Sequence, residues 1–251
     1  MPTPIDILLD PVSLIFLSIY AALILWEAAF PARELPEVRY WQVMGLTSFV
    51  AFFYLSSYLP IWLDPYLEPY RLFDLTALPV YVAAPAGVLL YQFGLYLWHG
   101  SIHRSDFLWR TFHQMHHSAE RLDTWGAFWF SPLDMIGFTL LGSLCFALIV
   151  GLSPTAITAV LLFLNFLSVF QHANIRTPRW LGYLIQRPEA HTVHHARGIH
   201  AYNYADLPLF DLLFGTFNNP EGYEHETGFY HGASTRLREM LTFRNVDKPR
   251  S

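Results

Sequence analysis

The sequence predicts an all-α, multi-pass membrane protein, with about three spans and a helical hairpin capped by a histidine-rich helical domain. The chain has 251 residues, of which 53% are hydrophobic and only 14% are charged, whereas an ordinary soluble domain carries about 25% charged residues. So few charges could not cover a water-exposed surface of this size. Ten of the twelve histidines lie between residues 99 and 200. The net charge of −5 gives no electrostatic support for binding nucleic acid.

The first predicted span is the apolar run from residue 12 to residue 30, which only Glu27 interrupts. A helix of about 20 apolar residues crosses the hydrocarbon of a bilayer. No basic segment precedes the run and no small-residue cleavage site follows it, so a span is favoured over a signal peptide. Glu27, near the end of the run, is expected to lie at the membrane interface. Residues 31–42 then form a polar link.

Two further uncharged runs, residues 43–63 and 75–98, predict the second and third spans. A short acidic segment, residues 64–74, connects them. Pro79 and Pro85 are expected to delay the start of the third helix or to kink it. The third span delivers the chain to the first histidine of the histidine-rich region.

The uncharged run from residue 135 to residue 171 is too long for one simple span. Gly151-Leu-Ser-Pro154 in its middle is typical of a turn. We therefore expect two short helices joined as a hairpin, each at the low edge of the spanning length. An aromatic stretch before the hairpin is expected to form an interfacial belt, with some rings lining a route into the site. Its rings are Trp125, Phe128, Trp129 and Phe130.

This arrangement of spans puts three polar segments on one side of the membrane, residues 31–42, 99–134 and 172–251. All 15 lysines and arginines except Arg71 lie in these segments. The positive-inside rule then places the histidine-rich side in the cytoplasm, although a long tail counts less in that rule. The tail shows no retrieval signal, which favours a bacterial inner membrane over the endoplasmic reticulum.

Eight histidines recur at helical spacing. The first pair is four residues apart, and the pattern His-x-x-His-His then occurs twice, so each set shares one helix face. Imidazole nitrogen is the commonest protein ligand for transition metals. Eight such nitrogens exceed the ligands of one ion and predict a two-metal site. The eight residues are His99, His103, His113, His116, His117, His191, His194 and His195.

Two more histidines lie close to this pattern. His172 follows the predicted hairpin, where the chain returns to the histidine side, and is expected to be a ninth ligand. His200 could ligate, support a ligand or face solvent. No cysteine accompanies the histidines, which argues against a structural zinc site. The Glu-x-x-His pairs of soluble di-iron bundles are absent from the sequence, so iron with O₂ is the favoured chemistry.

The histidine pattern, together with Asn203-Tyr204 and the segment from Asp211 to Phe217, resembles the fatty acid hydroxylase / sterol desaturase superfamily of integral-membrane di-iron enzymes. The resemblance covers over half of the chain and implies two irons on a helical bundle, O₂ activation and oxidation of a lipid C–H bond. Members include lipid and sterol hydroxylases, sterol desaturases and an enzyme that cleaves alkylglycerol ethers. We expect three parts: spans in 1–98, an oxygenase core in 99–220 and a polar tail in 221–251.

The chain departs from the family pattern at one position. Some members carry a histidine four residues after the one that matches His172, and here that residue is Arg176. The resemblance therefore implies nine histidine ligands rather than ten. Water or a neighbour such as Asn174 would complete the shell.

Four aspartates could orient ligating imidazoles by accepting their second N–H, or could instead cap helices and face solvent. Asp211 is a candidate supporting residue because it lies in the family-like segment, and Asn203 is another because it closely follows the last histidine pair. Gly215-Thr216 is expected to form a turn that docks the tail under the site. The four aspartates are Asp123, Asp134, Asp206 and Asp211.

The function predicted from these residues is O₂-dependent hydroxylation of a lipid that enters from the bilayer. No flavin, haem or ferredoxin motif is visible in the sequence, so an external protein must donate the electrons. A desaturase on the same two-iron centre is the first alternative. A non-catalytic metal-binding or transport protein and a membrane hydrolase with two zinc ions are the others.

Overall fold

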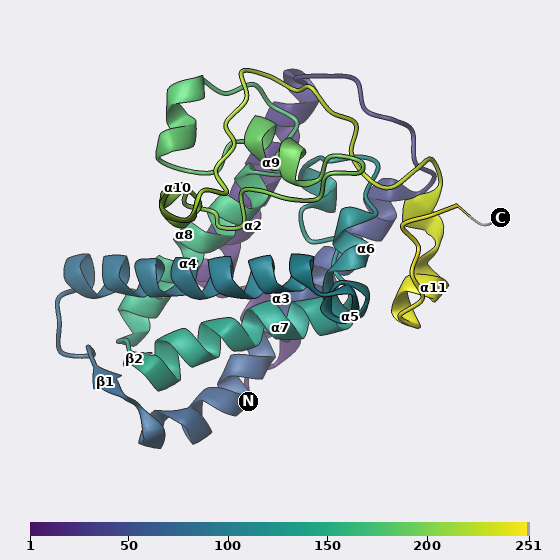
Figure 1. Ribbon diagram of the computed structural model, residues 1–251. Helices are drawn as coiled ribbons and strands as arrows, with labels where there is room; N and C mark the ends of the chain where they lie inside the picture. Colours follow the sequence, from purple (N-terminus) through teal and green to yellow (C-terminus); the bar gives the residue numbers. More distant parts are fainter. Residues whose placement is uncertain (250–251) are drawn as a thin grey trace.

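A computed structural model describes residues 1–249, and nearly all of its regular structure is helical. Five long helices form an elongated apolar body, and short helices gather at one end of it (Figure 1). Helix α3 packs against α7, and both α2 and α4 pack against α8. The long helices are α2 (Pro11–Ala29), α3 (Trp41–Leu67), α4 (Val80–Arg104), α7 (Pro132–Ser143) and α8 (Pro154–Phe170).

The remaining elements are short. The N-terminal helix α1 is Pro4–Leu8, and the 3₁₀ turn η1 is Glu68–Tyr70. The short pieces of the histidine-rich end are α5 (Asp106–Leu108), η2 (Trp109–His113), α6 (Gln114–His117), η3 (Thr124–Gly126), η5 (Arg179–Tyr183), α9 (Pro188–His194), α10 (Leu209–Phe214), η6 (Ala233–Thr235) and α11 (Leu237–Leu241).

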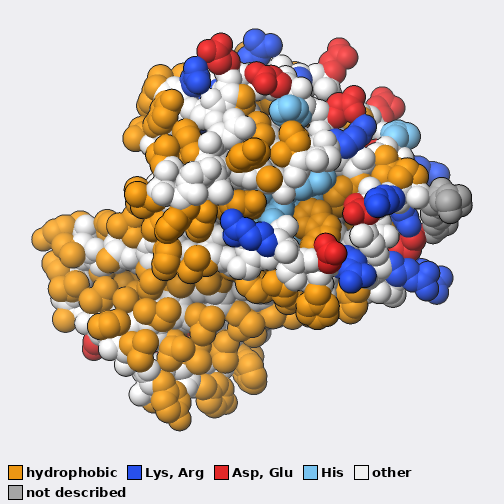
Figure 2. Space-filling model, in the orientation of Figure 1, with side chains coloured by type: hydrophobic (Ala, Val, Ile, Leu, Met, Phe, Trp, Pro, Cys, Tyr) orange, Lys and Arg blue, Asp and Glu red, His pale blue; other side chains and the backbone are white. Residues whose placement is uncertain are grey.

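Four helices within residues 1–249 are long and apolar enough to cross a membrane. They confirm the three predicted spans and add the first arm of the hairpin as a fourth candidate. Hydrophobic side chains cover this half of the visible surface, whereas charged residues and histidines gather on the other half (Figure 2). The four stretches are Pro11–Ala29, Trp41–Tyr70, Val80–Arg104 and Pro132–Ile149.

Local signals explain where the spans begin. Asp10 caps α2, since its carboxylate accepts a hydrogen bond from the backbone N–H of Val12. Pro79 delays the third span as predicted, so that α4 begins at Val80. The helix continues to Arg104, several residues beyond the predicted end of the span. This extension places the first two histidines on a rigid helix.

The predicted hairpin is confirmed. After α7 the chain makes a π-helical stretch, η4 (Leu144–Ile149), then a two-residue strand β2 (Val150–Gly151), and returns as α8. Strand β2 pairs in parallel with β1 (Phe73–Asp74), which ties the hairpin turn to the connection before α4. The second arm has 17 residues, the length of a short span.

The expectation that Glu27 lies at the membrane interface is wrong, because its side chain is buried inside the protein. Its Oε2 accepts hydrogen bonds from the backbone N–H of Thr124 at 2.9 Å, from the Thr124 hydroxyl at 2.8 Å and from the backbone N–H of Asn174 at 2.8 Å. A buried carboxylate requires such partners. Glu27 therefore ties the end of α2 to two segments that follow metal-site histidines.

The aromatic stretch before the hairpin is a core feature rather than an interfacial belt. Phe128 and Trp129 are each only 2% exposed. Phe128 packs against the rings of Phe16, Phe49 and Phe52 from two spans. The expectation of a belt was wrong because the stretch folds back and packs against α2 and α3 in the protein core.

Candidate metal centre

The nine histidines predicted to bind metal form two adjacent groups. Within each group, one ring nitrogen from every histidine lies within 4.8 Å of the others. The imidazoles of His117 and His195, one from each group, stack with their centroids 4.1 Å apart. The five-histidine cluster consists of His99, His103, His113, His117 and His194, and the four-histidine cluster consists of His116, His172, His191 and His195.

The two His-x-x-His-His motifs divide between the clusters in the same way. His113 ends the π-helical turn η2, and His116 and His117 follow on α6. In the first motif His113 and His117, four residues apart, share one cluster, and His116 belongs to the other. The motif on the α-helix α9 divides in the same way, with His191 and His195 in one cluster and His194 in the other. Residues four apart on a helix point in nearly the same direction, whereas adjacent residues diverge.

Backbone carbonyls of one loop orient three histidines of the five-histidine cluster. His103 Nδ1 lies 2.8 Å from the carbonyl of His200, His194 Nδ1 2.7 Å from that of Tyr202, and His99 Nδ1 2.8 Å from that of Tyr204. His200 and Tyr202 adopt left-handed backbone conformations, with φ of 44° and 70°. Such conformations cost about 1–3 kcal/mol each in non-glycine residues and persist only where the surrounding structure holds them.

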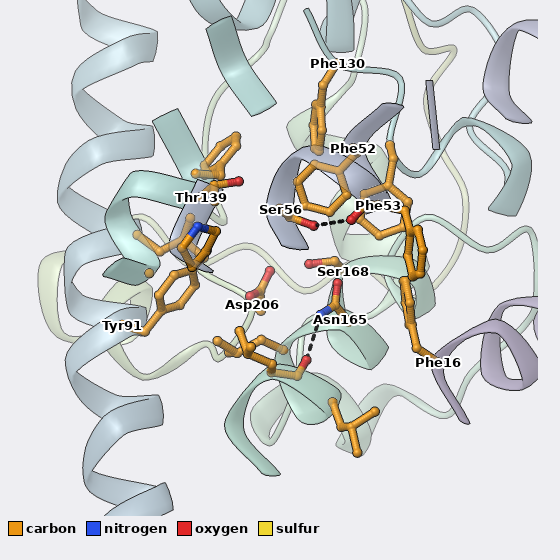
Figure 3. A pocket seen from close by; sticks show the side chains of 18 of the residues that line it. Phe16, Phe52, Phe53, Ser56, Tyr91, Phe130, Thr139, Asn165, Ser168 and Asp206 are labelled. Carbon is orange, nitrogen blue, oxygen red and sulfur yellow. Dashed lines mark hydrogen bonds between the residues drawn. The ribbon is translucent and has the colours of Figure 1, made fainter. Parts of the chain in front are cut away.

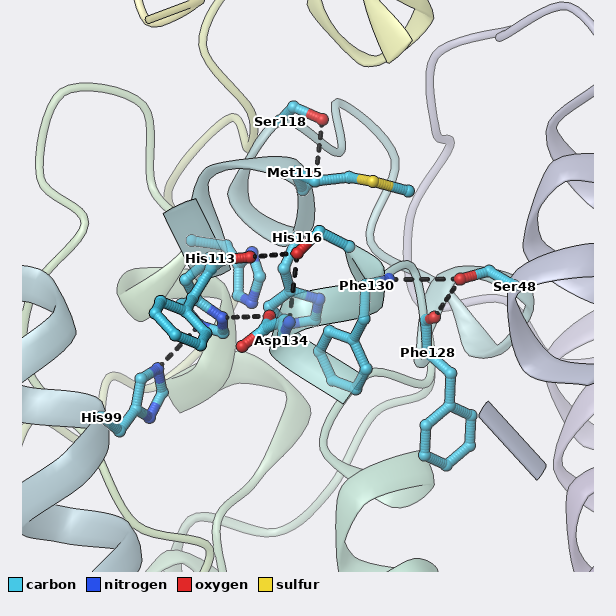
Figure 4. Close-up of polar contacts among 12 residues, drawn as sticks. Ser48, His99, His113, Met115, His116, Ser118, Phe128, Phe130 and Asp134 are labelled. Carbon is cyan, nitrogen blue, oxygen red and sulfur yellow. Dashed lines mark hydrogen bonds and ion pairs between the residues drawn. The ribbon is translucent and has the colours of Figure 1, made fainter. Parts of the chain in front are cut away.

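A carboxylate orients a fourth histidine. The Oδ2 of Asp134, a buried residue on α7, lies 2.7 Å from His113 Nδ1 (Figure 4). A neutral imidazole carries a single N–H, and donating it through Nδ1 leaves a lone pair on Nε2. The group that accepts the Nδ1–H of a ring thus fixes Nε2 as the nitrogen that the ring offers to a metal.

The distances between these Nε2 atoms fit a shared cation. His99 Nε2 lies 2.9 Å from His113 Nε2 and 3.0 Å from His194 Nε2. Because all three rings donate through Nδ1, these contacts bring lone pairs together, which is repulsive unless a positive ion lies among them. Two nitrogens bound at right angles to one ion, with bonds of about 2.1 Å, are about 3.0 Å apart. The Nε2 atoms of His103 and His117 are buried without a hydrogen-bond partner within residues 1–249.

The four-histidine cluster has the same short contacts. His172 Nε2 lies 3.1 Å from His116 Nε2 and 3.0 Å from His191 Nε2, and the Nε2 atoms of His191 and His195 are 3.1 Å apart. Burial holds the pKa of His116, His191 and His195 well below the usual value, and nearby imidazoles lower it further. Neutral imidazole is the form that binds a metal ion. The residues of both clusters therefore fit a two-metal centre.

Among the residues predicted to support the ligands, His200 stands closest to the clusters. Its ring Nδ1 lies 3.1 Å from His117 Nδ1, and its carbonyl holds His103. Asp211 acts one step further away, since it accepts hydrogen bonds from the backbone N–H groups of Tyr204 and Ala205. The side-chain amide of Asn203 holds the same loop by hydrogen bonds to backbone groups, including one that it donates to the Ala190 carbonyl.

The other aspartates do not contact the histidines. Asp123 accepts from the Trp41 indole, and Asp206 accepts from the side chains of Gln92 and Gln171. Asp134 alone of the four reaches an imidazole, and sequence spacing gave no reason to prefer it. The carbonyls of Tyr202 and Tyr204 could not have been identified from the sequence, because every residue carries a carbonyl.

Arg176, which stands where some family members have a tenth histidine, and the nearby Asn174 both contact the link after α2. Arg176 is exposed and directs its guanidinium towards the Ala32 carbonyl, 3.5 Å away. Asn174 donates its side-chain amide to the Arg33 carbonyl at 2.7 Å. Both residues thus connect the histidine-rich end to the link after α2. The predicted Gly215-Thr216 turn is confirmed, with Gly215 at φ 76° ending α10.

A largely apolar cavity of about 270 Å³ leads from the spans to the histidines. Aromatic rings from several helices surround it, and polar groups such as Ser168 and Asn165 are scattered between them (Figure 3). It touches histidines of both clusters, and Phe130 and Phe138 line it beside them. The histidines that line it are His99, His113, His116, His172 and His191.

The fold and the site define a multi-pass membrane protein with two histidine clusters that fit a di-metal site, at the end of an apolar cavity. Residues 84–216 match the family model described as fatty acid hydroxylase, and the chain belongs to this family.

A relative is the ornithine lipid hydroxylase OlsE of Rhizobium tropici, which is 32% identical over 144 residues. The alignment covers 53% of this chain and 41% of the relative, so the chain matches less than half of that protein's length. The comparison with solved structures gave no match.

Proposed function

We propose that the protein is a membrane-bound, di-iron, O₂-dependent enzyme that hydroxylates a C–H bond of a lipid. The observation that carries this proposal is the apolar cavity, which runs among the membrane helices and touches histidines of both clusters. A lipid chain is the natural occupant of a cavity lined by hydrophobic and aromatic side chains. Its end would then lie beside the metal centre.

The nine histidines would hold the two irons, five at one position and four at the other. When bound, the irons supply the activation of O₂ for an attack on an unactivated C–H bond. Iron is favoured over structural zinc because the ligand set is entirely imidazole, without cysteine. Family membership supports the same choice.

The chain's own residues position the substrate and exclude water. The ring of Phe130 lies 4.6 Å from that of His116, and Phe138 lies 5.8 Å from His113, between centroids. These rings keep the cavity dry where it meets the histidines, and a dry site strengthens every electrostatic interaction inside it. These rings would fix how far the lipid chain reaches into the cavity, and so which of its carbons lies beside the metal centre and is oxidised.

The substrate class is a membrane lipid, and a lipid with an amino-acid headgroup is the first candidate because the relative is named an ornithine lipid hydroxylase. The charge distribution of the sequence supports a centre on the cytoplasmic side of a bacterial inner membrane. An external electron-donor protein completes the proposal, since the sequence has no motif for a redox group other than the histidines.

Lipid profiling by mass spectrometry tests the proposal. Cells that express the protein are compared with cells that express His116→Ala, and with His231→Ala as a matched control because His231 is 88% exposed. The expected product carries one additional oxygen and is absent with His116→Ala. A product that has lost two hydrogens would establish a desaturase instead. Lipid cleavage by a zinc-loaded protein without O₂ would establish a hydrolase, and bound metal without any new lipid would contradict catalysis.

A further inference from the structure

A second cavity, of about 390 Å³, approaches the five-histidine cluster from the polar half of the protein. Figure 2 shows histidine side chains between acidic and basic residues on this half. His103 lines the second cavity, whereas the apolar cavity is lined by other cluster histidines, and none of the nine lines both. Its charged lining residues are Asp106, Arg110, Arg197, Asp247 and Lys248.

Trp109 connects this cavity to the cluster. It is half-buried, lines the cavity and begins the π-helical turn that carries His113. The centroid of its ring lies 5.0 Å from that of His103 and 4.9 Å from that of His117. One indole thus borders both the polar cavity and two histidines of the five-histidine cluster.

The proposed hydroxylation needs a route for electrons. The reaction RH + O₂ + 2 e⁻ + 2 H⁺ → ROH + H₂O consumes two electrons from outside the protein. The cluster histidines are buried or half-buried. The apolar cavity lies among α2, α3, α7 and α8, where a water-soluble carrier protein cannot approach. The polar cavity offers a route to the five-histidine cluster from the charged half.

We propose that electrons reach the metal centre through Trp109, from a water-soluble one-electron carrier protein that docks over the polar cavity. The inference rests on the proposed function. Two reduced carriers become oxidised and two ferric ions become ferrous, while the indole ends unchanged. Three basic residues against two acidic ones at the cavity favour a carrier with an acidic docking face, which charge complementarity would steer.

The experiment follows anaerobic reduction of the ferric centre in the full chain, loaded with iron in lipid nanodiscs, after rapid mixing with a reduced [2Fe–2S] ferredoxin. Trp109→Leu should slow reduction by about tenfold, and Trp109→Phe, which keeps a ring, by less. Iron content and the ferric absorption spectrum should stay those of the wild type. Trp180→Leu is the matched control, because Trp180 is 62% exposed and lines neither cavity.

A second variant tests docking without touching the cluster. Lys248→Glu should slow reduction by ferredoxin and leave reduction by the small reductant methyl viologen unchanged. It keeps the test decisive if Trp109→Leu fails to fold. The inference would be overturned if Trp109→Leu were reduced at the wild-type rate, or if Lys248→Glu slowed reduction by both reductants equally. It would also be overturned if methyl viologen reduced the wild type and ferredoxin did not. A wild type that oxidises no lipid with O₂ refutes the proposed function instead.

Discussion

Replacement of Asp134 by alanine is the sharpest test of how the centre is held. Asp134 lies on α7, fully buried, and its carboxylate is 2.7 Å from His113 Nδ1. It is the one carboxylate that contacts an imidazole of the two clusters within the described residues. Without it, the His113 N–H would be left unpaired in a buried site, and the ring would be free to turn.

The magnitude follows from that one hydrogen bond. A hydrogen bond to a charged group contributes about 1.5–3 kcal/mol, which corresponds to roughly 10- to 150-fold in affinity. Partners behind metal-binding histidines contribute about 10- to 100-fold in metal affinity. Asp134→Ala should therefore lower iron affinity by about one to two orders of magnitude. Asp134→Asn retains an acceptor oxygen, so its loss should be smaller.

Iron affinity is measured by competition between the purified protein and a chromophoric chelator, alongside lipid hydroxylation. Asp123→Ala is the matched control, because Asp123 is equally buried but accepts from Trp41 and Arg121, away from the histidines. It should lower the melting temperature and leave iron affinity unchanged. Wild-type iron affinity in Asp134→Ala would refute the role assigned to the carboxylate.

Three other variants test the surroundings of the centre. His200→Gly keeps the carbonyl that holds His103 but removes the ring beside His117, and chelator competition should show about tenfold weaker iron binding; wild-type affinity would remove His200 from the support of the site. Glu27→Ala loses three buried hydrogen bonds and should cost about 3 kcal/mol in thermal unfolding; an unchanged melting temperature would contradict that. Gly126→Ala would place a Cβ 2.3 Å from the Trp41 ring and should destabilise by about 1–3 kcal/mol; normal stability would show that the ring moves aside.

The spans and the hairpin could be predicted because each is encoded by a continuous stretch of sequence. An uncharged run of sufficient length has no stable alternative in a bilayer, and proline or a turn sequence marks its ends, as at Pro79 and at Gly151-Leu-Ser-Pro154. The candidate histidines could be selected for a similar reason, since spacings of three and four residues identify neighbours on a helix.

Contacts between distant segments could not be predicted in this way. Glu27 looks like an interfacial charge in the sequence, and its partners lie 97 and 147 residues away. Phe128 looks like part of an aromatic belt, because an apolar ring suits lipid and protein interior equally. The two clusters combine histidines from α4, η2, α6, α9 and the segment that follows α8, and helical spacing does not show which of these segments face one another.

The two clusters differ in how firmly they hold their imidazoles, and this difference predicts the order in which metal is lost. All five Nδ1 atoms of the first cluster have a polar partner, whereas two of the four in the second, those of His191 and His195, have none within residues 1–249. Fixed rings bind metal more tightly, so graded chelation should release one iron per chain first, with a distinct change in the iron spectrum. Three of the four histidines of the second cluster line the apolar cavity, so lipid oxidation should cease at this first step. Simultaneous loss of both irons would show that the difference in hydrogen bonding does not control affinity.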